Sequence, residues 1–79
     1  MTTEELRTIG AQVAADLRAR AGSNRVPEEL SRRFIAVRSE LFQRGIFDPV
    51  LVRFDSATVP KASMQQIADQ LAAVIAGLK

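Results

Sequence analysis

The sequence contains no cysteine, histidine, tryptophan or tyrosine. Without cysteine and histidine, the chain has no disulfide and lacks the thiolate and imidazole ligands of most zinc sites. The same absences exclude nucleophilic triads and histidine acid–base chemistry, on which many enzymes depend. The four glycines are dispersed, so a glycine-rich phosphate loop is missing too. We therefore predict a protein that is not an enzyme, with no catalytic, cofactor-binding or metal-binding residues.

Long apolar runs and a strong net charge are absent as well. No stretch approaches the roughly 18 consecutive apolar residues that a membrane-spanning helix needs. The N-terminal sequence MTTEELRT is acidic and polar, whereas a secretory signal begins with a basic region and an apolar run. These absences predict a cytoplasmic protein that does not contact membranes. The net charge of +2 indicates no particular partner.

What remains is the composition of a small folded domain. The chain has 79 residues, enough for one domain, and 47% of them are apolar, as in ordinary globular proteins. A chain this short buries little surface and often needs a further stabilising device. Because disulfides and the usual zinc ligands are absent, self-association is the stabilising device that remains. We predict a single helical domain over residues 1–79.

Three segments carry apolar residues at the spacing of amphipathic helices, over residues 4–21, 27–44 and 64–78. This pattern predicts an all-α fold, a small three-helix bundle. The connector lengths predict that the first two helices form an antiparallel pair and that the third returns across both. The predicted core consists of the residues on the apolar stripes, namely Leu6, Ile9, Val13, Leu17, Leu30, Phe34, Val37, Leu41, Leu51, Phe54, Ile67, Leu71, Val74 and Leu78.

Local signals mark several helix ends. Thr2 and Glu5 have the spacing of a capping box, in which each side chain bonds the other residue's backbone N–H. Ser63 and Gln66 have the same spacing and predict that the last helix starts at about residue 64. Gly45 is suited to a left-handed cap at the end of the second helix.

The connector over residues 45–60 is unusually apolar for a surface loop. Asp48 followed by Pro49 is a good helix start, which predicts a short fourth helical element over residues 49–55, between the second and third main helices. The alternative is a short strand, because apolar and polar residues also alternate here. Such a strand could pair only with a second copy of the chain, so we favour the helix.

The arginines raise the question of nucleic-acid binding. Phosphate contacts need unpaired cations on one surface. Here, however, four arginines follow an acid by four residues, a spacing that favours ion pairs on a helix. Nucleic-acid binding is therefore the less favoured prediction. The predicted pairs are Asp16 with Arg20, Glu28 with Arg32, Glu29 with Arg33, and Glu40 with Arg44.

Gly10 and Arg38 each allow two interpretations. Gly10 lies beside the apolar stripe of the first helix, where it either admits a closely packed neighbour or is merely tolerated. Arg38 projects into the apolar arc of the second helix. Its head group either reaches water past an apolar stem or forms an ion pair with Asp48 or Asp55.

The excess of apolar residues on the second helix and the connector predicts a protein–protein interaction module. The partner would be a second copy of the chain or a larger subunit to which it is an accessory. The alternative is a small nucleic-acid-binding or transcriptional regulator that uses surface arginines. The predicted interface comprises Ile35, Arg38, Phe42, Ile46, Phe47, Val50, Leu51 and Phe54.

Overall fold

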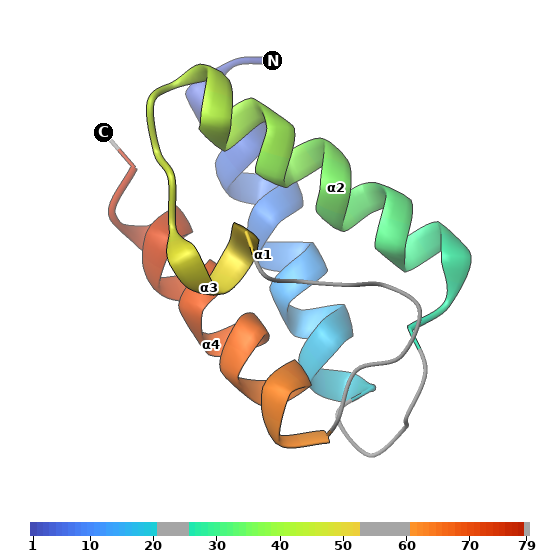
Figure 1. Ribbon diagram of the computed structural model, residues 1–79. Coiled ribbons are helices and arrows are strands. Elements are labelled where there is room, and N and C mark those ends of the chain that lie inside the picture. The colour runs from blue at the N-terminus through green and yellow to red at the C-terminus, as the bar shows by residue number, and fades with distance from the viewer. Residues whose placement is uncertain (21–25, 53–60, 79) are drawn as a thin grey trace.

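The computed structural model describes residues 1–20, 26–52 and 61–78, with the side chains of all of these except residues 61–63. These segments contain no strand and form the helices α1 (Thr3–Ala19), α2 (Glu28–Gln43), α3 (Pro49–Val52) and α4 (Lys61–Ala76) (Figure 1). The all-α prediction is confirmed. The segment that begins at Pro49 is helical as far as Val52, so the strand alternative is wrong for these residues.

The central helix is α1, which runs antiparallel to both α2 and α4 and packs against each, most extensively against α4 (Figure 1). The short helix α3 packs against α4 and is also bonded to α2 through Arg38. Few backbone positions of α2 come close to α3 or α4. The last helix packs against α1, as predicted, but the prediction that it also crosses α2 is wrong.

The predicted core is largely confirmed. Phe34 lies at its centre with no exposed surface, and Met64 and Ile75 are also buried although they were not among the predicted core residues. Ile9, Val74 and Leu78 were predicted in the core but are only partly buried at its edge. Phe54 lies outside the described residues. The buried residues that match the prediction are Leu6, Val13, Leu17, Leu30, Phe34, Val37, Leu41, Leu51, Ile67 and Leu71.

Two of the three predicted helix-end signals are confirmed. At the start of α1, the Glu5 backbone N–H donates to Thr2 Oγ1 (3.1 Å) and the Thr2 backbone N–H donates to Glu5 Oε1 (3.3 Å), as in a capping box. At the end of α2, Gly45 has a φ of 80°. The Ile46 backbone N–H then donates to the Leu41 carbonyl (2.9 Å), which completes a Schellman motif and turns Ile46 toward the core.

The predicted start of the last helix is wrong. Because α4 begins at Lys61, Ser63 lies inside the helix and is not its N-cap. Spacing alone cannot distinguish a capping pair from two residues that happen to lie three apart within a longer helix.

At Gly10, Ile75 of α4 packs directly onto α1. A Cβ atom built on Gly10 would lie 2.3 Å from Cδ1 and 2.6 Å from Cγ1 of Ile75. Real side chains never come this close, so no residue larger than glycine fits without displacing Ile75. Because Ile75 is only 3% exposed and β-branched, it has little freedom to move. The interpretation that Gly10 admits a neighbouring helix is the one that the structure supports.

We expect Gly10→Ala to destabilise the protein although alanine is the better helix former. The gain in helix propensity is about 1 kcal/mol, whereas overpacking a core costs about 1–3 kcal/mol. Chemical denaturation of Gly10→Ala, Ile75→Val and the double variant measures the balance. Ile75→Val removes the closest atom, so it should cost less in the Gly10→Ala background than in the parent. Equal costs in the two backgrounds would contradict the contact.

The capping box also predicts how Glu5 titrates. Its hydrogen bonds with the Thr2 side chain and then with the Thr2 backbone N–H lower the pKa of Glu5 from the ordinary value of 4.5. This interaction therefore stabilises the fold fully above pH 4.5 and is lost as the pH falls through the lowered pKa. NMR titration of the Glu5 carboxyl should show the lowered pKa, and Thr2→Ala should raise it. An unchanged pKa in Thr2→Ala would show that the capping box is not formed.

Candidate protein-interaction surface

Two of the side chains predicted to meet a partner are exposed. Phe47 has 67% of its surface exposed and Ile35 has 41%. The half-buried Phe42 stacks against Phe47 in a tilted arrangement, with the two ring centroids 5.3 Å apart. A further exposed side chain, Val52 (51%), was not predicted. It could have been found from helix geometry, because a helix that turns Leu51 inward turns the next residue about 100° away.

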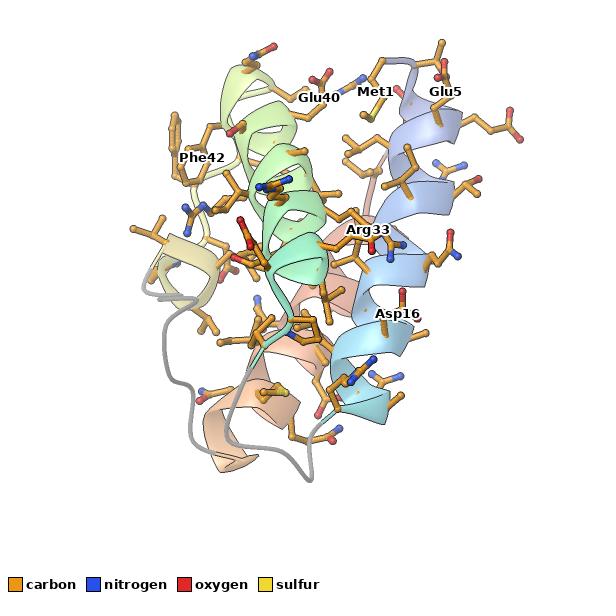
Figure 2. The ribbon with its side chains drawn as sticks, turned by 90° about the vertical axis from the view of Figure 1, so that its right-hand side faces the viewer. Met1, Glu5, Asp16, Arg33, Glu40 and Phe42 are labelled. Atoms are coloured by element: carbon orange, nitrogen blue, oxygen red, sulfur yellow. The ribbon has the colours of Figure 1, made fainter. Side chains whose placement is uncertain are left out.

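We define the α2–α3 patch as Ile35, Phe42, Phe47 and Val52, which lie on α2, on α3 and in the turn that joins them. Ile35, Arg38 and Phe42 recur at a helical spacing of three and four, so they share one side of α2. Arg38 joins this side to α3 by a hydrogen bond to the Leu51 carbonyl (3.1 Å). Figure 2 shows Phe42 pointing away from α1, on the side of α2 where α3 lies.

Three residues predicted at the interface contribute instead to the core or its edge. Leu51 is 1% exposed, because α3 packs against α4 and directs this side chain into the core. Ile46 and Val50 are half-buried and pack against the same core. The assignment of Leu51 to the interface is therefore wrong, and its parallel assignment to the core is right. Phe54 lies outside the described residues.

Arg38 is half-buried and lies beneath the patch. Its guanidinium carbon is 5.7 Å from the centroid of the Phe34 ring, within the range of a cation–π contact. Its Nη1 donates to a carbonyl of α3 that such a short helix cannot satisfy internally. Of the two acids considered as its partners, Asp48 is engaged by Gln70, and Asp55 lies outside the described residues. Arg38 therefore holds α3 against α2.

Asp48 has two roles at the start of α3. Its Oδ1 accepts hydrogen bonds from the backbone N–H groups of Val50 (2.9 Å) and Leu51 (3.2 Å), as an N-cap does. Its Oδ2 accepts a hydrogen bond from the Gln70 side chain of α4. The Asp48 carboxylate thus caps the start of α3 and bonds this helix to α4. Arg38 bonds α3 to α2.

We expect Asp48→Ala to lower the free energy of unfolding by about 0.5–2 kcal/mol, the usual cost of losing an N-cap. Asp48→Asn keeps an oxygen that can accept from the backbone, so it should cost less. Chemical denaturation measures both variants. Hydrogen exchange at the Val50 and Leu51 amides should accelerate in Asp48→Ala. Unchanged exchange there would show that the cap is not what orders α3.

Most arginines in the described segments are engaged within the chain. Two of the four predicted pairs are observed: Glu28 with Arg32 (2.7 Å) and Glu40 with Arg44 (3.9 Å). The other contacts join different elements. They run from Arg18 to Asp69 (2.8 Å), from Arg33 to Asp16 (2.8 Å), from Arg7 to the Leu78 carbonyl (2.8 Å), and from Arg44 to the Met1 carbonyl (2.8 Å) and Thr3 Oγ1 (2.9 Å).

The remaining two predicted pairs, Asp16 with Arg20 and Glu29 with Arg33, are wrong. Asp16 on α1 and Arg33 on α2 bond each other across the two helices instead (Figure 2). Each of these residues had a suitable partner one turn away on its own helix. The packing of α1 against α2 brings them together and leaves the other two charges, Arg20 and Glu29, without that partner.

No protein-family model matches this chain, and neither does any curated protein or solved structure. Among the described residues, no group of acidic side chains could hold a metal ion. The described helices include none that is long and apolar enough to cross a membrane.

Proposed function

We propose that this chain is a non-enzymatic helical module that binds another protein through the α2–α3 patch. The partner is a second copy of the chain or a larger subunit of an assembly. A cytoplasmic location remains a prediction from the sequence.

One observation carries this proposal. The described segments expose four large apolar side chains, and three of them, Ile35, Phe47 and Val52, belong to the α2–α3 patch. Single exposed apolar residues are ordinary, but residues gathered on one side mark interaction surfaces. Aromatic side chains are also enriched in interfaces, where they supply much of the binding energy. The stacked pair of Phe42 and Phe47 is such a feature.

The patch also has a defined shape. Arg38 and Asp48 bond α3 to its neighbours on both sides, and Leu51 fixes it in the core. Phe47 precedes this anchored helix directly. A surface held in one conformation loses less entropy when it binds than a mobile one.

The arginine contacts support a protein partner over the nucleic-acid alternative. A guanidinium whose charge is already paired with a carboxylate attracts a phosphate less strongly than an unpaired one. The alternative predicts an affinity for DNA or RNA that falls steeply as salt is added. A gel-shift or fluorescence-anisotropy titration at low and moderate salt measures it, and we expect no binding of this kind.

We expect Phe47→Ser to weaken self-association or partner binding by at least about tenfold. An exposed fraction of 67% of a phenylalanine corresponds to at least roughly 100 Å². Burial of that area contributes about 2.5 kcal/mol, and about 1.4 kcal/mol is a factor of ten. Sedimentation equilibrium at micromolar to millimolar concentration measures self-association. Affinity capture on immobilised parent and variant chains measures binding to another subunit.

Two variants serve as controls. Gln12→Ser alters an exposed residue of α1, away from the patch, and should change neither association nor stability. Leu51→Ala should instead destabilise the monomer by about 2–5 kcal/mol, as is usual for a buried leucine. Two results together would contradict the proposal. The parent chain would stay monomeric, and it would capture the same proteins as Phe47→Ser.

A further inference from the structure

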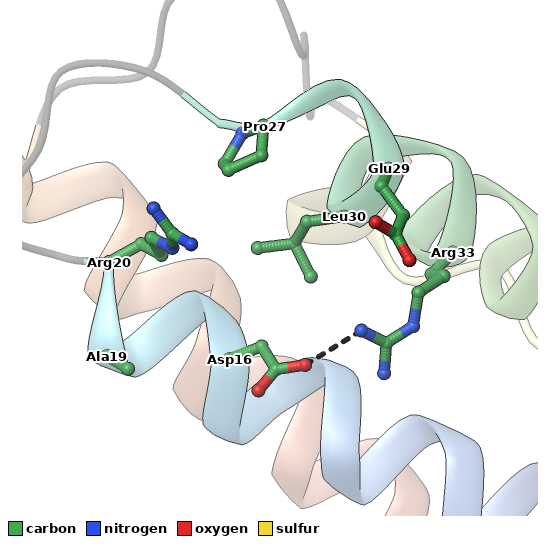
Figure 3. Close-up of a pocket in the computed structure, with 7 residues that line it drawn as sticks. All are labelled: Asp16, Ala19, Arg20, Pro27, Glu29, Leu30 and Arg33. Carbon is green, nitrogen blue, oxygen red and sulfur yellow. Dashed lines mark hydrogen bonds and ion pairs between the residues drawn. The ribbon is translucent and has the colours of Figure 1, made fainter.

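A hollow of about 340 Å³ lies between the end of α1 and the start of α2 (Figure 3). Its volume is at the lower end of the range of roughly 300–1,000 Å³ found for small-molecule sites. It belongs neither to the α2–α3 patch nor to the contact between α1 and α4. The described residues that line it are Asp16, Ala19, Arg20, Pro27, Glu29, Leu30 and Arg33.

The hollow combines a neutralised ion pair with two charges that have no partner among the described residues. Asp16 and Arg33 bond each other at 2.8 Å. Arg20 on α1 and Glu29 on α2 make no ion pair or side-chain hydrogen bond with another described residue. Figure 3 shows these two side chains on opposite sides of the hollow, with Leu30 between them. The site therefore offers one cation, one anion and an apolar surface.

The apolar surface comes from Leu30, Ala19 and Pro27. Leu30 is only 5% exposed, whereas Arg20 and Glu29 are exposed to solvent. This is the usual composition of a small-molecule site, in which apolar contacts hold the body of the ligand and a few polar groups orient it.

We propose that the hollow binds a small zwitterion, a molecule with one carboxylate, one ammonium group and an aliphatic body, such as a free α-amino acid. The carboxylate faces Arg20, the ammonium group faces Glu29, and the aliphatic part lies on Leu30. A simple anion would be repelled by Glu29 and a simple cation by Arg20, because Asp16 and Arg33 neutralise each other. A ligand with both charges makes a favourable contact with each of these two exposed groups.

NMR titration with three matched probes tests this proposal. The probes are L-leucine, N-acetyl-L-leucine, which lacks the ammonium group, and L-leucinamide, which lacks the carboxylate. We expect saturable amide shifts at the lining residues with L-leucine. Binding of each derivative should be about 1.4- to fivefold weaker, as for the loss of one solvent-exposed ionic contact.

Two variants assign each charge to its side of the ligand. Arg20→Gln should weaken binding of L-leucine but not that of L-leucinamide, whose single positive charge Arg20 repels. Glu29→Gln should weaken binding of L-leucine but not that of N-acetyl-L-leucine, whose single negative charge Glu29 repels. Arg32→Gln removes an exposed arginine that does not line the hollow, so it should leave all three probes unaffected.

Three results would overturn the proposal. One is the absence of saturable shifts with L-leucine at the lining residues. Another is equal binding of all three probes, which would show that the charges are not recognised. The third is an equal effect of Arg32→Gln and Arg20→Gln, which would show only a general response to net charge.

Discussion

Leu51 of α3 is buried in the core to which α1, α2 and α4 also contribute. Its burial is the constraint on which the α2–α3 patch depends. A helix as short as Pro49–Val52 has almost no stability of its own, so its position comes from tertiary contacts. With Leu51 turned inward, Val52 must point toward solvent. Leu51, which was predicted to meet a partner, is thus buried, and its burial leaves the next residue, Val52, exposed.

Polar contacts complete this arrangement where the apolar contact alone would leave α3 free to rotate. Asp48 bonds the start of α3 to Gln70 of α4, and Arg38 bonds the Leu51 carbonyl from α2. The bond from Arg38, and those that Asp48 Oδ1 accepts from the Val50 and Leu51 N–H groups, also satisfy backbone groups that a helix of one turn leaves unbonded. The same few residues therefore order the connector and shape the surface beside it.

The ion pair between Asp16 and Arg33 has a comparable effect between α1 and α2. It joins two helices, and each of its residues was predicted to pair within its own helix, Asp16 with Arg20 and Arg33 with Glu29. An exposed ion pair contributes only about 0–1 kcal/mol, so this contact is a minor part of the stability. Because Asp16 and Arg33 pair with each other, Arg20 and Glu29 lack their predicted partners, and these two charges line the hollow.

The sequence by itself determined the all-α fold, most of the core, the capping box at Thr2 and the left-handed turn at Gly45, since these depend on spacing and local backbone chemistry. Only the tertiary structure decided that Ile75 packs onto Gly10, that Leu51 is buried, and that Asp16 pairs with Arg33. Helical spacing shows which residues share a face but not which neighbour covers it. Partners that are distant in sequence come together only when whole helices pack.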